Sequence, residues 1–75
     1  MMNTDTVTAK RILASNLTFH RKRLGYTQKE VAARAEIGLS TYGSYEDTRN
    51  FPAISKLTKV ANVLGVTISD LLRKP

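Results

Sequence analysis

The sequence contains no cysteine and only one histidine, His20. Without cysteine there is no disulfide, no thiolate nucleophile and no zinc site with Cys ligands. One imidazole cannot supply the histidine cluster of an ordinary catalytic metal site, so we expect no metal and no cofactor. No apolar run approaches the roughly 18–20 residues of a transmembrane helix, and no basic region followed by an apolar stretch opens the chain. We therefore expect no membrane association and a cytoplasmic location.

Acidic side chains are few compared with basic ones. The 75 residues include 12 Lys and Arg but only 6 Asp and Glu, which leaves a net charge of +6. With 41% hydrophobic and 24% charged residues, the composition is that of one small folded domain. The excess of positive charge favours an anionic partner, either nucleic acid or an acidic membrane surface. The membrane surface is disfavoured, because so short a chain needs the apolar face of every helix for its core.

Apolar residues recur at helical spacing over most of the chain, and no segment alternates as a strand does. Residues 1–8 lack this period and are expected to form a flexible arm. Gly25 ends the first helix, Thr27 and Glu30 form a capping box at the start of the second, and Pro52 suits the first turn of the fourth. The pattern predicts an all-α fold, a single compact five-helix domain over residues 9–73, with helices over 9–24, 28–35, 39–47, 52–64 and 68–72.

The same spacing predicts which side chains form the core. Leu13, Leu17 and Leu24 lie on one face of the first helix, with Phe19 beside it. Tyr42 and Tyr45 are assigned to the core rather than to a stacking platform for single-stranded nucleic acid. The last helix completes the core with Leu71 and Leu72.

A run in the middle of the chain resembles the helix-turn-helix of the phage-repressor-like family, the lambda repressor-like domains of bacteria and their phages. The resemblance covers about residues 13–72 and rests on the Thr-Gln-Lys-Glu helix start at 27–30, on Ala32, Glu46 and Pro52, and on the Leu-Gly-Val-Thr segment at 64–67. It implies that the second and third helices form the motif. The third helix would then enter the major groove of double-stranded DNA with its N-terminal residues nearest the bases.

One position in the turn of this motif departs from the family pattern. The family usually has glycine where this chain has Glu36, at a point where φ is often positive, and a glycine stands instead at Gly38. A non-glycine residue in that conformation costs roughly 1 kcal/mol. Two alternatives follow: Glu36 bears the strain, or the turn is built differently around Gly38.

The resemblance also implies which side chains of the third helix face the bases. Ser and Thr hydroxyls bond to several bases, and a Leu contacts a thymine methyl group. No Arg, Lys, Asn or Gln lies on this face, so we expect modest sequence selectivity with DNA shape carrying part of it. The alternative interpretation is an ordinary small polar helix face. The base-facing candidates are Leu39, Ser40, Thr41, Gly43 and Ser44.

Six other polar residues receive roles from the resemblance. We expect phosphate contacts from one pair of residues at the start of the second helix and from another pair after the third helix. The alternative for these four is a solvated surface. A further pair is expected to form a structural ion pair between the first helix and the end of the third, and the alternative for this pair is direct contact with DNA. The phosphate candidates are Gln28, Lys29, Arg49 and Asn50, and the ion pair is Arg21 with Glu46.

Taken together, these features predict a sequence-dependent double-stranded DNA-binding transcriptional regulator. We expect a nucleoid-associated homodimer with its dimer contact at Leu71, Leu72 and the loop before the last helix. It resembles small phage or mobile-element repressors and the controller proteins of restriction–modification systems. An enzyme is not expected, because the sequence offers no nucleophile–base pair, carboxylate dyad or Gly-rich phosphate loop. The alternative is a protein-interaction module, an antitoxin or adaptor, on the same fold, while an RNA-binding role has only the basic charge behind it.

Overall fold

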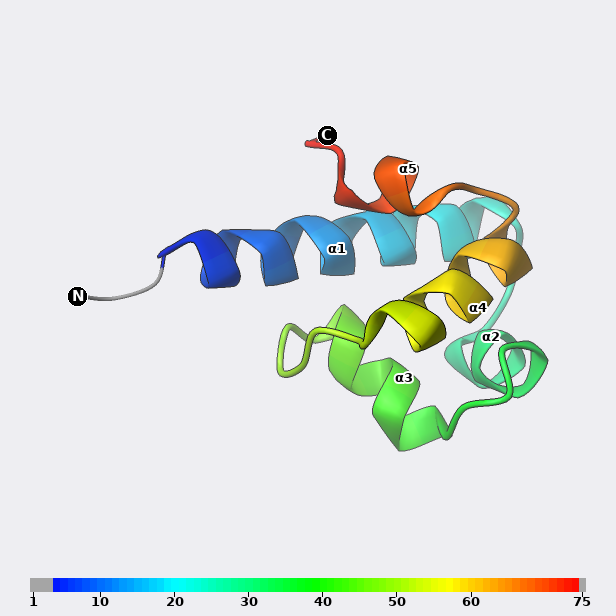
Figure 1. Ribbon diagram of the computed structural model, residues 1–75. Coiled ribbons are helices and arrows are strands. Elements are labelled where there is room, and N and C mark those ends of the chain that lie inside the picture. The colour runs from blue at the N-terminus through cyan, green and yellow to red at the C-terminus, as the bar shows by residue number, and fades with distance from the viewer. Residues whose placement is uncertain (1–3, 75) are drawn as a thin grey trace.

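The computed structural model describes residues 4–74, which form five α-helices joined by short connections (Figure 1). These residues contain no β-strand. The predicted all-α, five-helix architecture is therefore confirmed. The helices are α1 (Thr4–Arg23), α2 (Gln28–Arg34), α3 (Leu39–Glu46), α4 (Ile54–Leu64) and α5 (Ile68–Leu72).

The first helix begins earlier than the hydrophobic period predicts. Because α1 starts at Thr4, the assignment of residues 4–8 to a flexible arm is wrong, and residues 1–3 of that arm lie outside the described residues. Hydrophobic periodicity reports burial, whereas a helix extends past its last buried turn at little cost where neither Gly nor Pro intervenes. In Figure 1 the first turns of α1 project beyond the other helices.

Two of the three predictions for residues at helix ends are confirmed. Gly25 follows α1 with a φ of 76°, in the left-handed conformation expected of a helix-ending glycine. Thr27 is the N-cap of α2, with the capping box formed in full. Pro52 departs from its prediction, because it precedes the N-cap Ala53 and so lies outside the first turn of α4. Its fixed φ and missing N–H are equally compatible with a loop that leads into a helix.

The core lies between the helices and is built from side chains of all five. α1 packs against α3 and α5, and α2 packs against α3 and α4. Tyr42 and Tyr45 are both buried, as predicted, with their rings edge to face at 6.3 Å. None of the helices within residues 4–74 is long and apolar enough to cross a membrane. The buried apolar cluster comprises Leu13, Leu17, Val31, Ala32, Ala35, Tyr42, Tyr45, Leu57, Val60, Ala61, Leu64 and Leu71.

Three apolar residues expected in this core lie at the surface instead. Phe19 is 61% exposed, Leu24 41% and Leu72 40%. The helical period predicts a broad apolar stripe on α1, but only the part that faces other helices becomes buried. Leu72 follows the fully buried Leu71, and neighbouring residues on a helix point in different directions.

Candidate nucleic-acid interface

The motif begins at the capping box of α2. The Thr27 N–H donates to Glu30 Oε1 at 2.8 Å, and the Glu30 N–H donates to Thr27 Oγ1 at 3.1 Å. These bonds satisfy two N–H groups that a helix start leaves without partners. The backbone bond from Thr27 stabilises the Glu30 carboxylate and lowers the pKa of that group. The start of α2 is therefore fixed by the local sequence.

The turn between α2 and α3 resolves the two alternatives for its strained position. Glu36 has a φ of 60°, whereas Gly38 has a φ of −67°. The Ile37 N–H donates to the Ala32 carbonyl oxygen at 2.9 Å, and the Glu36 N–H donates to the Ala33 carbonyl oxygen at 3.1 Å. This pair of bonds is the pattern of a helix that ends in a left-handed residue. Glu36 bears the strain, and Gly38 serves as the extended N-cap of α3.

One side of α3 is open to solvent. Leu39 is 48% exposed, Ser40 is exposed, and Thr41 and Gly43 are partly exposed. The opposite side carries the buried Tyr42, and α1 and α2 pack against the helix. The candidate base-facing residues near the start of α3 are thus accessible to a large partner.

Ser44 does not belong to this open face, and its assignment to the base-facing set is corrected. It is only 3% exposed, and its hydroxyl donates to the Thr41 carbonyl oxygen at 2.6 Å. The chain after α3 folds back on this turn, so that the N–H groups of Arg49 and Asn50 both donate to the Ser44 carbonyl oxygen, at 3.0 and 3.1 Å. The spacing along α3 does not reveal this covering loop.

Three of the four phosphate candidates have exposed side chains: Lys29, Arg49 and Asn50. The Arg49 guanidinium is already paired, since its Nε lies 2.7 Å from Asp47 Oδ2. Both side chains of this pair are well exposed, at 64% for Arg49 and 49% for Asp47. An exposed pair of this kind holds its partners weakly, so Arg49 remains available to another anion.

Gln28, the fourth candidate, points inward. Its Nε2 donates to Glu46 Oε1 at 3.0 Å, and the residue is partly buried. A phosphate contact through this nitrogen requires that bond to break. Its Oε1 lies near Gly43, where an added Cβ would sit at 3.8 Å from it, an ordinary contact distance. Packing within the protein therefore does not require glycine at position 43.

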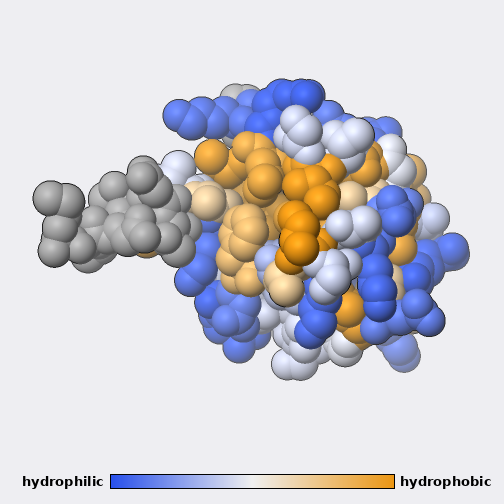
Figure 2. Space-filling model, in the orientation of Figure 1, coloured by the Kyte–Doolittle hydropathy of each residue, from blue (hydrophilic) through white to orange (hydrophobic). Residues whose placement is uncertain are grey.

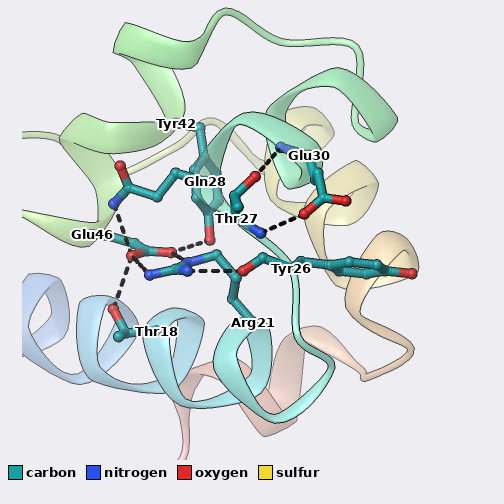
Figure 3. Close-up of polar contacts among 8 residues, drawn as sticks. All are labelled: Thr18, Arg21, Tyr26, Thr27, Gln28, Glu30, Tyr42 and Glu46. Carbon is teal, nitrogen blue, oxygen red and sulfur yellow. Dashed lines mark hydrogen bonds and ion pairs between the residues drawn. The ribbon is translucent and has the colours of Figure 1, made fainter.

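The carboxylate of Glu46 is the centre of a polar network that joins α1, α2 and α3 (Figure 3). Arg21 binds it with two nitrogens, Nε to Oε2 at 2.7 Å and Nη2 to Oε1 at 3.0 Å. Thr18 donates to Oε1 at 3.1 Å, and the Tyr42 hydroxyl donates to Oε2. Arg21 also donates to the Tyr26 carbonyl oxygen at 2.9 Å. The two charged side chains are nearly buried, with 12% of Arg21 and 5% of Glu46 exposed.

The pKa values of this network describe a buried but ionised pair. Burial acts to raise the pKa of Glu46, but the hydrogen bonds from Arg21, Tyr42 and Gln28 outweigh it, and the net shift is downward. The hydrogen bond to Glu46 raises the pKa of Arg21. Burial, followed by the bond to the Glu46 carboxylate, raises the pKa of Tyr42, so its hydroxyl stays protonated as a donor. The carboxylate therefore holds the end of α3 against α1 and α2.

Three residues that take part in these contacts are not predicted to do so from the sequence: Tyr42, Thr18 and Asp47. Tyr42 stands four residues before Glu46, and that helical spacing is a signal for a side-chain contact. Thr18 stands one turn before Arg21, but nothing in the sequence indicates which hydrogen-bond partner a threonine in a helix will have. Asp47 is an acidic residue two positions before Arg49, which a search for basic residues alone overlooks.

Comparison with known proteins identifies the family. A family model described as Helix-turn-helix matches residues 20–71. The chain is 36% identical over 62 residues to the HTH-type transcriptional regulator ImmR of Bacillus subtilis, covering 83% of this chain and 49% of that protein. It is 30% identical over 59 residues to the cryptic phage CTXphi transcriptional repressor RstR of Vibrio cholerae, covering 79% and 53% respectively. The chain spans about half the length of the curated relatives it matches.

A solved structure agrees with this assignment. The crystal structure of the hypothetical transcription factor NHTF from Neisseria superposes with a TM-score of 0.85 at 30% sequence identity, covering 89% of this chain and 77% of that one. The motif geometry defines a helix-turn-helix domain, a class of DNA-binding fold without enzymatic activity. The chain belongs to the lambda repressor-like helix-turn-helix family.

Proposed function

We propose that this protein is a double-stranded DNA-binding transcriptional regulator that reads the major groove with the start of α3. The observation that carries the proposal is the open face of α3, at Leu39, Ser40 and Gly43, on a helix held firmly from its other side. The net charge of +6 supports an anionic partner. The relatives described above are named as transcriptional regulators or repressors, which supports a regulatory role at DNA.

The contacts to DNA divide into two kinds. Lys29, Arg49 and Asn50 bind phosphates on either side of the groove and set the position of the domain. Leu39 and Ser40 read base edges, and Thr41 contributes from the partly exposed side of α3. Because these side chains make few bidentate contacts, sequence-dependent DNA shape supplies part of the selectivity.

The protein acts as a homodimer on a two-fold symmetric site. Two copies of a helix-turn-helix domain on one face of DNA read half-sites about 34 Å apart, one turn of the double helix. Doubling the phosphate and base contacts compensates for the few base contacts of each copy. This role places the protein in the cytoplasm, with the DNA that it controls.

Selection from a random-sequence duplex library tests the proposal directly. Binding is measured at low and at physiological salt, and the bound fragments are sequenced. We expect enrichment of an inverted repeat and a steep loss of affinity as salt rises, because each phosphate contact releases counterions. Absence of binding even at low salt contradicts the proposal.

Gly43→Ala separates DNA contact from folding. Alanine at this helix position meets no crowding within the protein, and replacing a mid-helix glycine stabilises a helix by about 1 kcal/mol. If the backbone of Gly43 approaches the groove, the same methyl group lowers DNA affinity about tenfold or more, as a loss of 1.4 kcal/mol does. The matched control is Asn62→Ala on the exposed surface of α4, which leaves DNA affinity unchanged. A Gly43→Ala protein that binds the selected site as well as the wild type refutes the close approach.

A protein-interaction module remains the second candidate function, and the exposed Leu39 favours it. A side chain that is 48% exposed at the start of α3 suits an apolar protein surface as well as a thymine methyl group. Salt distinguishes the two. Binding through phosphates weakens steeply with salt, whereas binding through an apolar contact does not.

A further inference from the structure

A cleft lies between α1 and the chain at the end of α5. Figure 1 shows α5 on one side of α1 and α3 on the other. In Figure 2 the surface over the end of the described chain is mostly hydrophilic. The cleft has a volume of about 350 Å³, which lies within the range of small-molecule sites. Its lining includes Asn16, Phe19, His20, Asp70, Arg73 and Lys74.

Asn16 fixes the wall of the cleft that the chain after α5 contributes. Its Nδ2 donates to the carbonyl oxygens of Leu71 and Arg73, both at 2.8 Å, and the residue is only 8% exposed. Leu71 itself is fully buried in the core, so its expected place in a dimer contact is wrong. The segment that carries Arg73 and Lys74 is therefore held beside α1 by hydrogen bonds from a nearly buried side chain.

Phe19 gives one part of the cleft an apolar wall. The side chain is 61% exposed, although phenylalanine is usually among the most buried residue types. Its ring meets the ring of His20 edge to face, with 5.1 Å between the centroids. An accessible aromatic ring accommodates a second flat ring, either offset and stacked or edge to face. This part of the cleft therefore suits a flat apolar group.

The chain after α5 makes another part of the cleft positive. Arg73 and Lys74 contribute two cations to the lining, against one carboxylate from Asp70. Both oxygens of that carboxylate already have partners, because Oδ2 accepts from the Thr67 N–H at 2.9 Å and Oδ1 lies 3.1 Å from Arg73 Nη1. The remaining donors of the Arg73 guanidinium and the Lys74 ammonium group suit an anion. Two cations against one carboxylate leave a single positive charge for that anion to balance.

His20 adds a hydrogen-bond donor to the lining. Its Nδ1 lies 3.1 Å from Arg23 Nη2. A guanidinium group has donors but no acceptor, so Nδ1 accepts this bond and the neutral ring carries its proton on Nε2. The cleft therefore combines an aromatic ring, a net positive charge and a donor from an imidazole.

We infer that this cleft binds a small aromatic monocarboxylate, with its ring against Phe19 and its carboxylate towards Arg73 and Lys74. The exposed ring selects the flat body, and the unbalanced positive charge selects the single negative charge. A guanidinium holds a carboxylate through charge-assisted hydrogen bonds. The lining residues come from α1, α5 and the segment after it, so the site leaves the open face of α3 free. This ligand site goes beyond the proposed function, because it requires neither DNA nor a second chain.

An NMR titration of the whole ¹⁵N-labelled chain tests the site, with phenylacetate as the probe. We expect saturable shifts of amide signals in residues 15–20 and 70–74, which contain the lining. A ligand of about ten non-hydrogen atoms that binds with ordinary efficiency has a dissociation constant on the order of 1–10 mM. Every sample is adjusted with NaCl to the same ionic strength, so that general screening is constant.

Two further probes separate the parts of the ligand. Phenylacetamide has the ring without the charge, and acetate has the charge without the ring. We expect each to bind at least about fivefold more weakly than phenylacetate. Phenylacetamide that binds as tightly as phenylacetate overturns the role of the positive charge. Acetate that binds as tightly overturns the role of the ring.

Two variants remove the corresponding parts of the cleft. Phe19→Ala should weaken phenylacetate binding about fivefold, and Lys74→Gln about threefold. The matched controls are Phe51→Ala, which removes an exposed ring from the loop before α4, and Lys56→Gln, which removes an exposed cation from α4. Both controls should bind phenylacetate as the wild type does. A wild type without saturable shifts overturns the inference, as do Phe19→Ala and Lys74→Gln proteins that bind like their controls.

Asp70→Asn gives the opposite sign, which a folding defect does not imitate. The substitution removes the negative charge from the cleft, while the amide oxygen still accepts from the Thr67 N–H. We expect phenylacetate to bind about threefold more tightly, and binding that does not tighten contradicts the placement of the carboxylate. The titrations contain no DNA, so a ligand site in a chain that does not bind DNA refutes the proposed function alone. DNA binding by a chain that does not bind phenylacetate refutes this inference alone.

Discussion

Replacing Glu46 with alanine removes the carboxylate on which three helices converge. The variant loses hydrogen bonds from Thr18, Gln28 and Tyr42 and the two-pronged contact from Arg21. The Arg21 guanidinium, 12% exposed, is then left without its counter-charge. Removing one partner of a buried ion pair costs about 3–5 kcal/mol. A domain of this size has a total stability of roughly 4–11 kcal/mol, so the loss brings the variant close to unfolding.

Thermal melting followed by circular dichroism measures this loss. In a domain of this length 1 kcal/mol shifts the melting temperature by roughly 4–8 °C, so we expect Glu46→Ala to melt at least about 12 °C lower. The matched control is Asp47→Ala. Asp47 pairs with Arg49 at the same 2.7 Å but at the surface, where a pair contributes about 0–1 kcal/mol. Equal decreases in melting temperature for Glu46→Ala and Asp47→Ala refute the reasoning. The N–O distance of an ion pair, rather than its burial, would then decide how much the pair stabilises the fold.

The pH dependence provides a second test of the same network. The pKa of Glu46 in the folded protein lies below its ordinary value of 4.5, so the carboxylate stabilises the fold fully above that value. This stabilisation is lost as the pH falls through the lowered pKa, where Glu46 becomes protonated in both states. The difference in melting temperature between the wild type and Glu46→Ala should therefore be large at pH 7 and shrink in strong acid. A difference that is constant with pH contradicts an ionised Glu46.

Three further predictions concern the backbone, each measured by urea unfolding. Glu36→Gly and Thr48→Gly remove side chains from φ values of 60° and 69°, and each should stabilise the protein by about 1 kcal/mol. Gly65→Ala, at a φ of 69°, should cost about 1–2 kcal/mol, whereas Gly38→Ala, at −67°, should avoid this penalty. Thr27→Ala should cost about 1 kcal/mol, because it removes the hydroxyl that caps α2. Unchanged stability in Glu36→Gly, Thr48→Gly, Gly65→Ala or Thr27→Ala contradicts the corresponding strain or cap, as does a loss in Gly38→Ala equal to that in Gly65→Ala.

Local signals in the sequence are sufficient to predict most of the fold. The capping box at Thr27 and the glycine at position 25 act within a few residues, and the structure has both where the sequence places them. The apolar period predicts the inner faces of the helices for the same reason. The start of α1 and the position of Pro52 escape this reasoning, because neither is decided by burial or by a cap.

The candidate interface is less predictable because it depends on contacts between distant segments. Ser44 is covered by a loop whose path no short-range pattern reveals, and Gln28 is turned inward by a carboxylate 18 residues away. Thr48 has a positive φ of 69°, which a β-branched residue rarely adopts and which its own sequence context does not announce. For the turn at Glu36 the sequence predicts two alternatives, and the positive φ of Glu36 in the structure shows which of them is right.

The two sides of α3 divide its polar residues unequally, and this division bears on specificity. Three polar side chains of α3 form their hydrogen bonds inside the protein. The Tyr42 hydroxyl donates to Glu46, the Ser44 hydroxyl donates to the Thr41 carbonyl oxygen, and the Glu46 carboxylate accepts from Arg21. The outward side retains the Ser40 hydroxyl and the apolar Leu39. A recognition helix that is held rigidly but carries few base-reading groups discriminates DNA mainly through where it is placed. Under the proposed function, the position set by the Glu46 network and by the pairing of two copies on one DNA site therefore contributes more to selectivity than any single side chain on the open face.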